Sequence, residues 1–202
     1  MTRIKLCGLS RPCDIEAANE LKPEYIGFVF AQKSKRYVTP EKAARLKQLL
    51  APGIQAVGVF VRESPQTVAA LLNSNVIDMA QLHGGEDEAY IRQLRKLSDK
   101  PIIQAFRIKT ADDIANAQQS SADFLLLDSG AGMGTVFDWN LVQNLTRPYF
   151  LAGGLGVENA GKAHALLKPY AVDVSSGIET DGYKDKEKMA AFVAAVRKDN
   201  RP

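Results

Sequence analysis

The chain alternates between short apolar runs and longer amphipathic runs from one end to the other. The apolar runs are rich in β-branched and aromatic residues and are apolar at successive positions, which is typical of parallel strands covered on both faces. They predict eight strands, at residues 4–7, 25–30, 56–61, 79–82, 102–107, 124–127, 149–152 and 171–174. The amphipathic runs predict helices near residues 11–21, 40–50, 65–74, 86–98, 110–119, 138–146, 157–168 and 185–199.

Eight strand–helix units within 202 residues, without a long linker, predict an α/β fold of one particular kind. We expect a compact (β/α)8 TIM barrel, a single domain over residues 1–202. Because such barrels usually need about 250 residues, its loops must be short. The alternative is an open doubly wound sheet, which carries a glycine fingerprint after its first strand when it binds a nucleotide. The sequence Cys7-Gly-Leu-Ser10 at that place is not this fingerprint.

Composition narrows the class of protein without changing the predicted fold. Hydrophobic residues make up 46% and charged residues 24% of the chain, as in ordinary soluble proteins. The net charge is only +3 and the basic residues are scattered, so we expect no nucleic-acid partner. No apolar run approaches the ~20 residues of a membrane span, and early charges argue against a signal peptide. We therefore expect a cytoplasmic protein without a membrane partner.

The metal-binding residue types are too sparse to predict a metal centre. Cys7 and Cys13 do not form a C-x-x-C pair, and the histidines are His83 and His164 alone. Structural zinc sites need four such ligands at short, paired spacings. We expect no metal and no cofactor.

The last two predicted strands both end in turns suited to an anion. Gly153 and Gly154 follow one strand, and Ser175, Ser176 and Gly177 follow the other. In a (β/α)8 barrel the loops after strands seven and eight commonly build a phosphate site from backbone N–H groups. We therefore predict that these five residues bind a phosphate.

Four polar side chains lie at or just beyond other strand ends, where a barrel places its active site. Cys7 is either a small buried hydrophobe or, as a thiolate, a base or nucleophile. Asp128 follows an apolar strand and either caps its loop or acts as a general acid or base. His83 either hydrogen-bonds its own loop or faces the site. Arg36 lies in a basic loop, which is either solvated or binds a carboxylate or phosphate through the guanidinium fork.

Nine pieces of the sequence, in order from residue 3 to about residue 197, resemble the phosphoribosylanthranilate isomerase family of tryptophan biosynthesis. The pieces are Lys5-Leu-Cys-Gly8, Gly27-Phe-Val-Phe30, Ser34-Lys-Arg-Tyr37, Val57-Gly-Val-Phe-Val61, Gln81-Leu-His-Gly84, Leu126-Leu-Asp128, Phe137-Asp-Trp139, Gly153-Gly-Leu155 and Val172-Asp-Val-Ser-Ser-Gly-Ile-Glu179. One departure is Ala131-Gly-Met-Gly-Thr135, where the family often has glycine and a small hydroxyl residue. We interpret the segment 130–134 as a flexible loop over the site.

The resemblance implies an Amadori rearrangement of N-(5-phosphoribosyl)anthranilate, a small phosphorylated substrate. It makes Asp128 the general acid that protonates the furanose ring oxygen and Cys7 the general base that removes the C2′ proton. It implies that Arg36 holds the anthranilate carboxylate and that His83 and Asp173 line the sugar site. The N–H groups near Gly154, Ser176 and Gly177 would hold the phosphate. The enzyme would be a monomer or a homodimer.

Two other functions stay open at this point. One is a histidine-pathway aminoaldose isomerase, a similar phosphate-binding barrel that uses paired aspartates at the ends of strands one and six. The presence of Cys7 at the end of the first strand argues against it. The other is a sugar-phosphate-binding protein without catalytic activity, which would need neither Cys7 nor Asp128.

Overall fold

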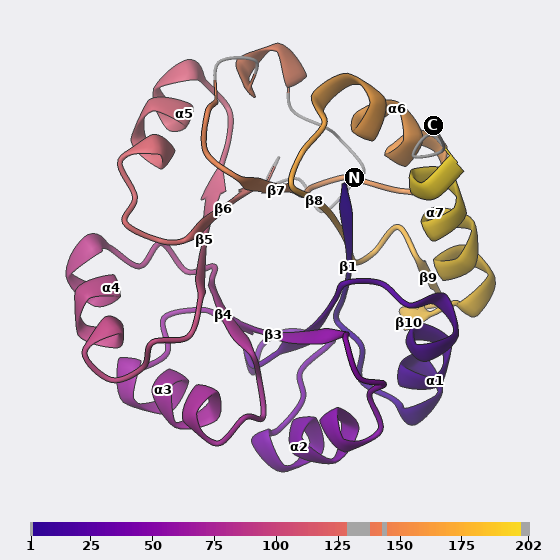
Figure 1. Ribbon diagram of the computed structural model, residues 1–202, viewed down its shortest axis with the longest axis horizontal. Coiled ribbons are helices and arrows are strands. Elements are labelled where there is room, and N and C mark those ends of the chain that lie inside the picture. Colours follow the sequence, from indigo (N-terminus) through magenta and orange to yellow (C-terminus); the bar gives the residue numbers. More distant parts are fainter. Residues whose placement is uncertain (1, 129–137, 143–144, 199–202) are drawn as a thin grey trace.

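The computed structural model describes residues 2–128, 138–142 and 145–198. Within them, eight parallel strands form a closed barrel in which each strand pairs with the next and the last pairs with the first. The helices surround this barrel, as the view along its axis shows (Figure 1). The predicted (β/α)8 barrel is confirmed, and the open doubly wound sheet is excluded.

The barrel strands are β1 Arg3–Cys7, β2 Tyr25–Val29, β3 Gln55–Phe60, β4 Met79–Leu82, β5 Ile102–Arg107, β6 Phe124–Asp128, β7 Tyr149–Leu151 and β8 Ala171–Val174. The helices are α1 Pro12–Leu21, α2 Pro40–Gln48, α3 Pro65–Asn73, α4 Glu88–Arg95, α5 Ala111–Gln118, α6 Val157–Leu167 and α7 Lys186–Lys198, with the 3-10 turn η1 at Trp139–Val142. A small antiparallel hairpin, β9 Glu179–Thr180 and β10 Tyr183–Lys184, precedes α7.

Local capping explains where two of these helices begin. The Thr39 hydroxyl accepts a hydrogen bond from the Lys42 N–H, and Pro40 occupies the first position of α2. Ser64 and Pro65 play the same parts at the start of α3. Such a cap satisfies a helical N–H group, and proline costs nothing where no N–H is needed.

The prediction of an α-helix over residues 138–146 was wrong for the part that the structure describes. Residues 139–142 form one 3-10 turn, and the Leu141 N–H bonds the Asp138 carbonyl three residues back. The Asp138 side chain also accepts from the Asn140 N–H, which stabilises a local turn in competition with a helix. Residues 143–144 lie outside the described residues, as does the glycine-rich segment 130–134.

The barrel interior is filled at the N-terminal end of the strands. Tyr25, Phe124, Phe150 and Tyr170 contact one another through their rings, with centroids 4.7–5.8 Å apart for the Phe124–Tyr170, Phe150–Tyr170, Tyr25–Phe150 and Phe124–Phe150 pairs. Apolar side chains from the middle of several strands pack against this group. Because this end is closed by packing, an open cavity is left for the C-terminal end of the strands.

None of the helices in the described ranges combines the length and the apolar character needed to cross a membrane.

Candidate active site

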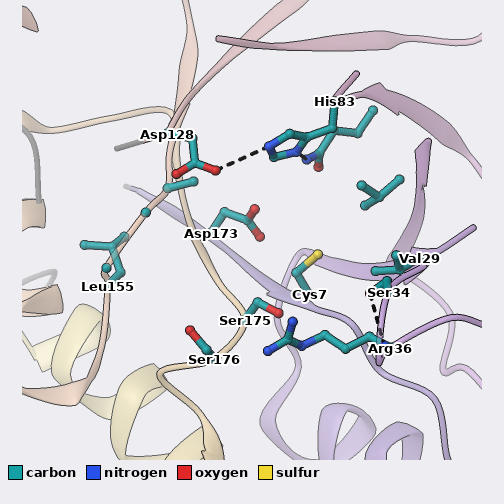
Figure 2. A pocket seen from close by; sticks show the side chains of 15 residues that line it. Cys7, Val29, Ser34, Arg36, His83, Asp128, Leu155, Asp173, Ser175 and Ser176 are labelled. Atoms are coloured by element: carbon teal, nitrogen blue, oxygen red, sulfur yellow. Dashed lines mark hydrogen bonds and ion pairs between the residues drawn. The ribbon is translucent and has the colours of Figure 1, made fainter. Parts of the chain in front are cut away.

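A cavity of about 290 Å³ opens at the C-terminal ends of the barrel strands. Every residue predicted for the site except Gly177 lines it: Cys7, Arg36, His83, Asp128, Gly153, Gly154, Asp173, Ser175 and Ser176. Figure 2 shows the side chains of Cys7, Asp128 and Asp173 arranged around this space. Residues from six different strands or the loops after them are thus brought together.

Cys7 sits at the end of β1 and is 7% exposed. On the neighbouring strand, a Cβ atom at Gly27 would lie 2.6 Å from the Cys7 sulfur, so only glycine leaves room for the thiol there. Burial raises the pKa of the Cys7 thiol above its ordinary value, and a nearby carboxylate, Asp173, adds to the rise. A thiolate at this position therefore needs help from a positive charge.

Lys5 supplies that positive charge from inside the barrel. It lies two residues before Cys7 on the same face of β1 and is 0% exposed. Its Nζ is 2.9 Å from Oδ1 of Asp173 on β8. Burial alone would lower the pKa of the Lys5 ammonium, but Asp173 and Cys7 outweigh burial, so the pKa is raised. The lysine stays charged and lowers the pKa of Cys7, opposing the effect of burial.

Asp128, at the end of β6, faces His83, which follows β4. The His83 Nε2 lies 3.3 Å from Asp128 Oδ2, and the two are joined in Figure 2. The buried Gln81 side chain places its Nε2 2.8 Å from His83 Nδ1. When the amide donates this hydrogen bond, a neutral imidazole carries its proton on Nε2, toward Asp128. Within the described part of the chain, Gln81 Oε1 has no hydrogen-bond partner.

The two predicted phosphate turns touch each other. A β-bridge joins Gly156 to Gly177, and a Cβ atom at Gly177 would lie 2.1 Å from the Leu155 carbonyl oxygen. Gly153 and Gly154 have φ angles of 83° and 66°, a region that favours glycine. The absence of a side chain at Gly177 therefore lets the two turns pack against each other, and Gly177 is not among the residues that line the cavity.

Arg36 reaches the cavity from the loop after β2, alongside Ser175. Gly8 makes room for it: φ is 82° there, and a Cβ atom would lie 2.5 Å from Arg36 Cδ. The guanidinium is already paired within the protein, since its Nε and Nη2 each lie 2.6 Å from one carboxylate oxygen of Glu179. That hydrogen-bonded pair raises the pKa of Arg36 further. The partner Glu179 was not predicted from the sequence.

Two residues that shape the site were missed although the sequence carried a signal for them. Lys5 and Gln81 are polar residues inside apolar strands, each two positions before a predicted site residue, Cys7 or His83. Because side chains alternate along a strand, residues two apart share a face. Both side chains therefore had to enter the barrel interior below the site.

The remaining metal-binding residue types are used in other ways. Cys7 and Cys13 are both unpaired thiols. The buried His164 hydrogen-bonds Thr2 Oγ1 at 2.8 Å, far from the cavity in the fold. Among residues 2–128, 138–142 and 145–198, no three His, Cys, Asp or Glu side chains are grouped so as to hold a metal ion.

Fold and site together define a (β/α)8-barrel protein with a thiol, a carboxylate and joined glycine turns around one cavity. Residues 4–195 match the family described as N-(5'phosphoribosyl)anthranilate (PRA) isomerase. The chain belongs to this family.

Individual relatives match this chain in sequence and in structure over 98% of its length. The N-(5'-phosphoribosyl)anthranilate isomerase of Endomicrobium trichonymphae is 44% identical over 202 residues, covering 98% of this chain and 99% of that one. Crystal structures of phosphoribosyl anthranilate isomerase from Thermus thermophilus and Thermotoga maritima are each 33% identical with a TM-score of 0.88. They cover 98% of this chain and 99% and 100% of theirs. A further crystal structure is of a phosphoribosyl anthranilate isomerase in complex with reduced 1-(o-carboxyphenylamino)-1-deoxyribulose 5-phosphate. That protein is 33% identical to this chain with a TM-score of 0.87, and the match covers 98% of this chain and 100% of the other.

Proposed function

We propose that this protein isomerises N-(5'-phosphoribosyl)anthranilate to 1-(2-carboxyphenylamino)-1-deoxyribulose 5-phosphate, a step of tryptophan biosynthesis. The observation that carries the proposal is that Cys7 and Asp128, from the first and sixth strands, line one cavity beside the joined glycine turns. An acid and a base at such places can flank a sugar held by its phosphate. The relative that binds the reduced carboxyphenylamino ligand supports this choice of substrate.

The phosphate is assigned to the turns at Gly153–Gly154 and Ser175–Ser176. Both turns lie at the C-terminal ends of barrel strands, and α6 begins directly after the first of them. The N-terminus of a helix and exposed backbone N–H groups favour an anion. Gly177 contributes by keeping the turns in contact, and the bound phosphate fixes the sugar relative to the reacting groups.

The first chemical step is assigned to Asp128. Its carboxylic acid protonates the furanose ring oxygen, the C1′–O bond breaks, and the nitrogen lone pair forms an iminium. His83 contacts the same carboxyl group and lines the sugar site with Asp173. A positioned general acid contributes roughly 10²–10⁴-fold to the rate.

The second step is assigned to Cys7 as a thiolate. It removes the C2′ proton, and the electron pair of that bond moves to reduce the iminium to an enolamine, which tautomerises to the ketone. The Lys5 ammonium lowers the pKa of the thiol and so favours the basic form. All of these steps move protons and electron pairs within one molecule, so the reaction balances without a metal, redox cofactor or second substrate.

Arg36 is assigned to binding of the anthranilate carboxylate.

The enzyme is expected to act in the cytoplasm, as a monomer or a homodimer. One relative, from Thermotoga maritima, is described as a dimeric phosphoribosylanthranilate isomerase. We expect neither a nucleic acid nor a membrane to take part in this function.

A turnover assay tests the proposal directly. N-(5'-phosphoribosyl)anthranilate is fluorescent through its anthranilate group, and purified protein should consume it with formation of the ketose phosphate, followed by fluorescence and mass spectrometry. Folded protein that left the substrate unchanged, or that converted only the histidine-pathway aminoaldose, would contradict the proposed function.

A further inference from the structure

The hairpin formed by β9 and β10 places two opposite charges across from each other. Glu179 pairs with Lys184 in the register of this hairpin, and Asp181 and Gly182 form its two-residue turn with φ angles of 52° and 81°. An Asp-Gly turn with both angles positive is a favoured connection for such a hairpin. The Lys184 Nζ lies 2.5 Å from Glu179 Oε1, and Lys184 is 8% exposed.

Glu179 uses both of its carboxylate oxygens on Arg36. Oε1 accepts from Nε–H and Oε2 accepts from one N–H of Nη2. These donors form one edge of the planar guanidinium, so the edge formed by Nη1 and the second Nη2 hydrogen is not used by Glu179. Arg36 lines the cavity, which makes that second edge the one available to a ligand.

Lys184 ties the same carboxylate to the phosphate turn. Besides Glu179, its Nζ contacts the Ser175 carbonyl oxygen at 2.8 Å and the Ser175 hydroxyl oxygen at 3.3 Å. The hairpin therefore connects Arg36, from the loop after β2, with the turn after β8. Charge-assisted contacts of this kind, largely removed from solvent, fix geometry more strongly than neutral hydrogen bonds.

We infer that Glu179 is a positioning residue for Arg36: it holds one edge of the guanidinium so that the other edge faces the carboxylate of the substrate. This inference rests on the proposed function, because it takes the anthranilate carboxylate as the group that Arg36 binds. Lys184 keeps Glu179 in place and sets the distance between the carboxylate-binding and phosphate-binding ends of the cavity.

A competing interpretation predicts that removing the charge of Glu179 has the opposite effect on ligand affinity. Glu179 is itself a carboxylate on Arg36, so it could act as an internal competitor that the substrate must displace. Removing its charge would then release the guanidinium and tighten ligand binding. If Glu179 orients Arg36, removing the charge weakens binding, because the amide of glutamine has one acceptor oxygen to serve Arg36 and Lys184 together.

The test is calorimetric titration of wild-type protein and Glu179→Gln with two ligands. One is reduced 1-(o-carboxyphenylamino)-1-deoxyribulose 5-phosphate, which carries the aromatic carboxylate; the other is ribulose 5-phosphate, which lacks it. We expect Glu179→Gln to lower the affinity for the first ligand about tenfold, the effect of losing one charge-assisted hydrogen bond. It should change the affinity for the second ligand by less than about threefold. Arg36→Lys should weaken the first ligand by a similar factor, and the double variant by little more than either alone, because both act through one fork.

Glu20→Gln is the matched control, since it removes the exposed ion pair between Glu20 and Lys186 on the neighbouring helices α1 and α7. It should leave both affinities unchanged. Thermal unfolding checks that each variant folds, and Glu179→Asp, which keeps the charge on a shorter stem, provides a second variant that should fall between wild type and Glu179→Gln.

Three results would overturn the inference: tighter binding of the first ligand, equal weakening of both ligands, or additive effects of Arg36→Lys and Glu179→Gln. If wild-type protein bound ribulose 5-phosphate but not the aromatic ligand, the proposed function would fail, and the inference with it. That failure is visible in the wild-type titration alone.

Discussion

Lys5 and Asp173 form an ion pair inside the barrel, 2.9 Å apart, and Lys5 lies two residues before Cys7 on the inward face of β1. The two charges act on the thiol with opposite signs: Lys5 lowers the pKa of Cys7, and Asp173 raises it. The mechanism proposed for this enzyme needs the thiolate, so these two residues, together with burial and the Lys184 ammonium, influence how much base is present at a given pH.

Replacing Lys5 by methionine should raise the pKa of the Cys7 thiol, because the cation that stabilises the thiolate is lost. The acidic limb of the pH–rate profile for kcat/KM should move to higher pH with it. The measurement is the pH dependence of iodoacetamide labelling at Cys7, with the modified residue identified by mass spectrometry. The exposed Cys13 serves as the reference thiol within the same molecule.

The matched variant Asp173→Asn removes a carboxylate that raises the pKa of Cys7, so the labelling curve of Cys7 should shift to lower pH while Lys5 keeps its proton. A shift of the same sign in both variants would contradict the electrostatic explanation. Because Lys5→Met leaves a buried carboxylate unpaired, it should also cost about 3–5 kcal/mol of unfolding free energy. The double variant Lys5→Met/Asp173→Asn removes both charges and should recover much of that loss, as measured by urea unfolding.

Cys7→Ala and Asp128→Asn should each reduce kcat by at least about a hundredfold, the lower end of a general acid–base contribution. Both substitutions are small, and the variants should remain folded by circular dichroism. Cys13→Ala is the control for loss of a thiol, since Cys13 lies in the first turn of α1, outside the cavity. Turnover close to wild type in Cys7→Ala or Asp128→Asn would reject the role assigned to that residue.

The barrel could be predicted because its signals are local. Each strand is a short apolar run, and proline with a capping hydroxyl marks the start of α2 and α3. The position of the site followed from the same pattern, because polar residues such as Cys7 and Asp128 stand where apolar strands end. The turn at residues 139–142 was mistaken for a helix because the spacing of apolar residues gives no information on side chains that compete for backbone hydrogen bonds. Here the Asp138 side chain accepts from the Asn140 N–H.

The partners inside the site could not be predicted, because they depend on contacts between distant parts of the chain. Lys5 meets Asp173 only because β1 closes the barrel against β8. Arg36 meets Glu179 only because a hairpin after β8 lies beside the loop after β2. Nothing in the sequence near Arg36 indicates that its guanidinium already has a carboxylate partner.

Gln81 should determine which nitrogen of His83 carries the proton. Its amide donates to Nδ1, which places the proton of a neutral imidazole on Nε2, toward Asp128. In Gln81→Glu the new carboxylate can only accept, so a neutral imidazole at His83 should carry its proton on Nδ1. Nitrogen-15 NMR of labelled protein distinguishes the two tautomers by chemical shift.

His164 gives an internal reference in the same spectrum. The Thr2 hydroxyl donates to the Pro169 carbonyl, so its oxygen accepts from His164, which must carry its proton on Nδ1. Wild-type protein should therefore show the two histidines in opposite tautomers. Gln81→Met, of similar volume, should leave His83 without a preference set by residue 81. A His83 tautomer that stayed the same in both variants would show that Asp128 alone determines it.

Gly177 should be required for space and not for an unusual backbone angle. A Cβ atom there would lie 2.1 Å from the Leu155 carbonyl oxygen, so even alanine must push the two phosphate turns apart. Gly177→Ala should cost about 1–3 kcal/mol of unfolding free energy, as overpacking does, and should also weaken the binding of inorganic phosphate.

Gly53→Ala is the control, because φ is 92° there but the space that an added Cβ atom would occupy is open. It should cost about 1–2 kcal/mol from backbone strain and leave phosphate binding unchanged. Urea unfolding and calorimetric titration separate the two effects: if Gly177→Ala lost stability but bound phosphate as wild type does, the contact between the turns would be structural and the anion site would not depend on it.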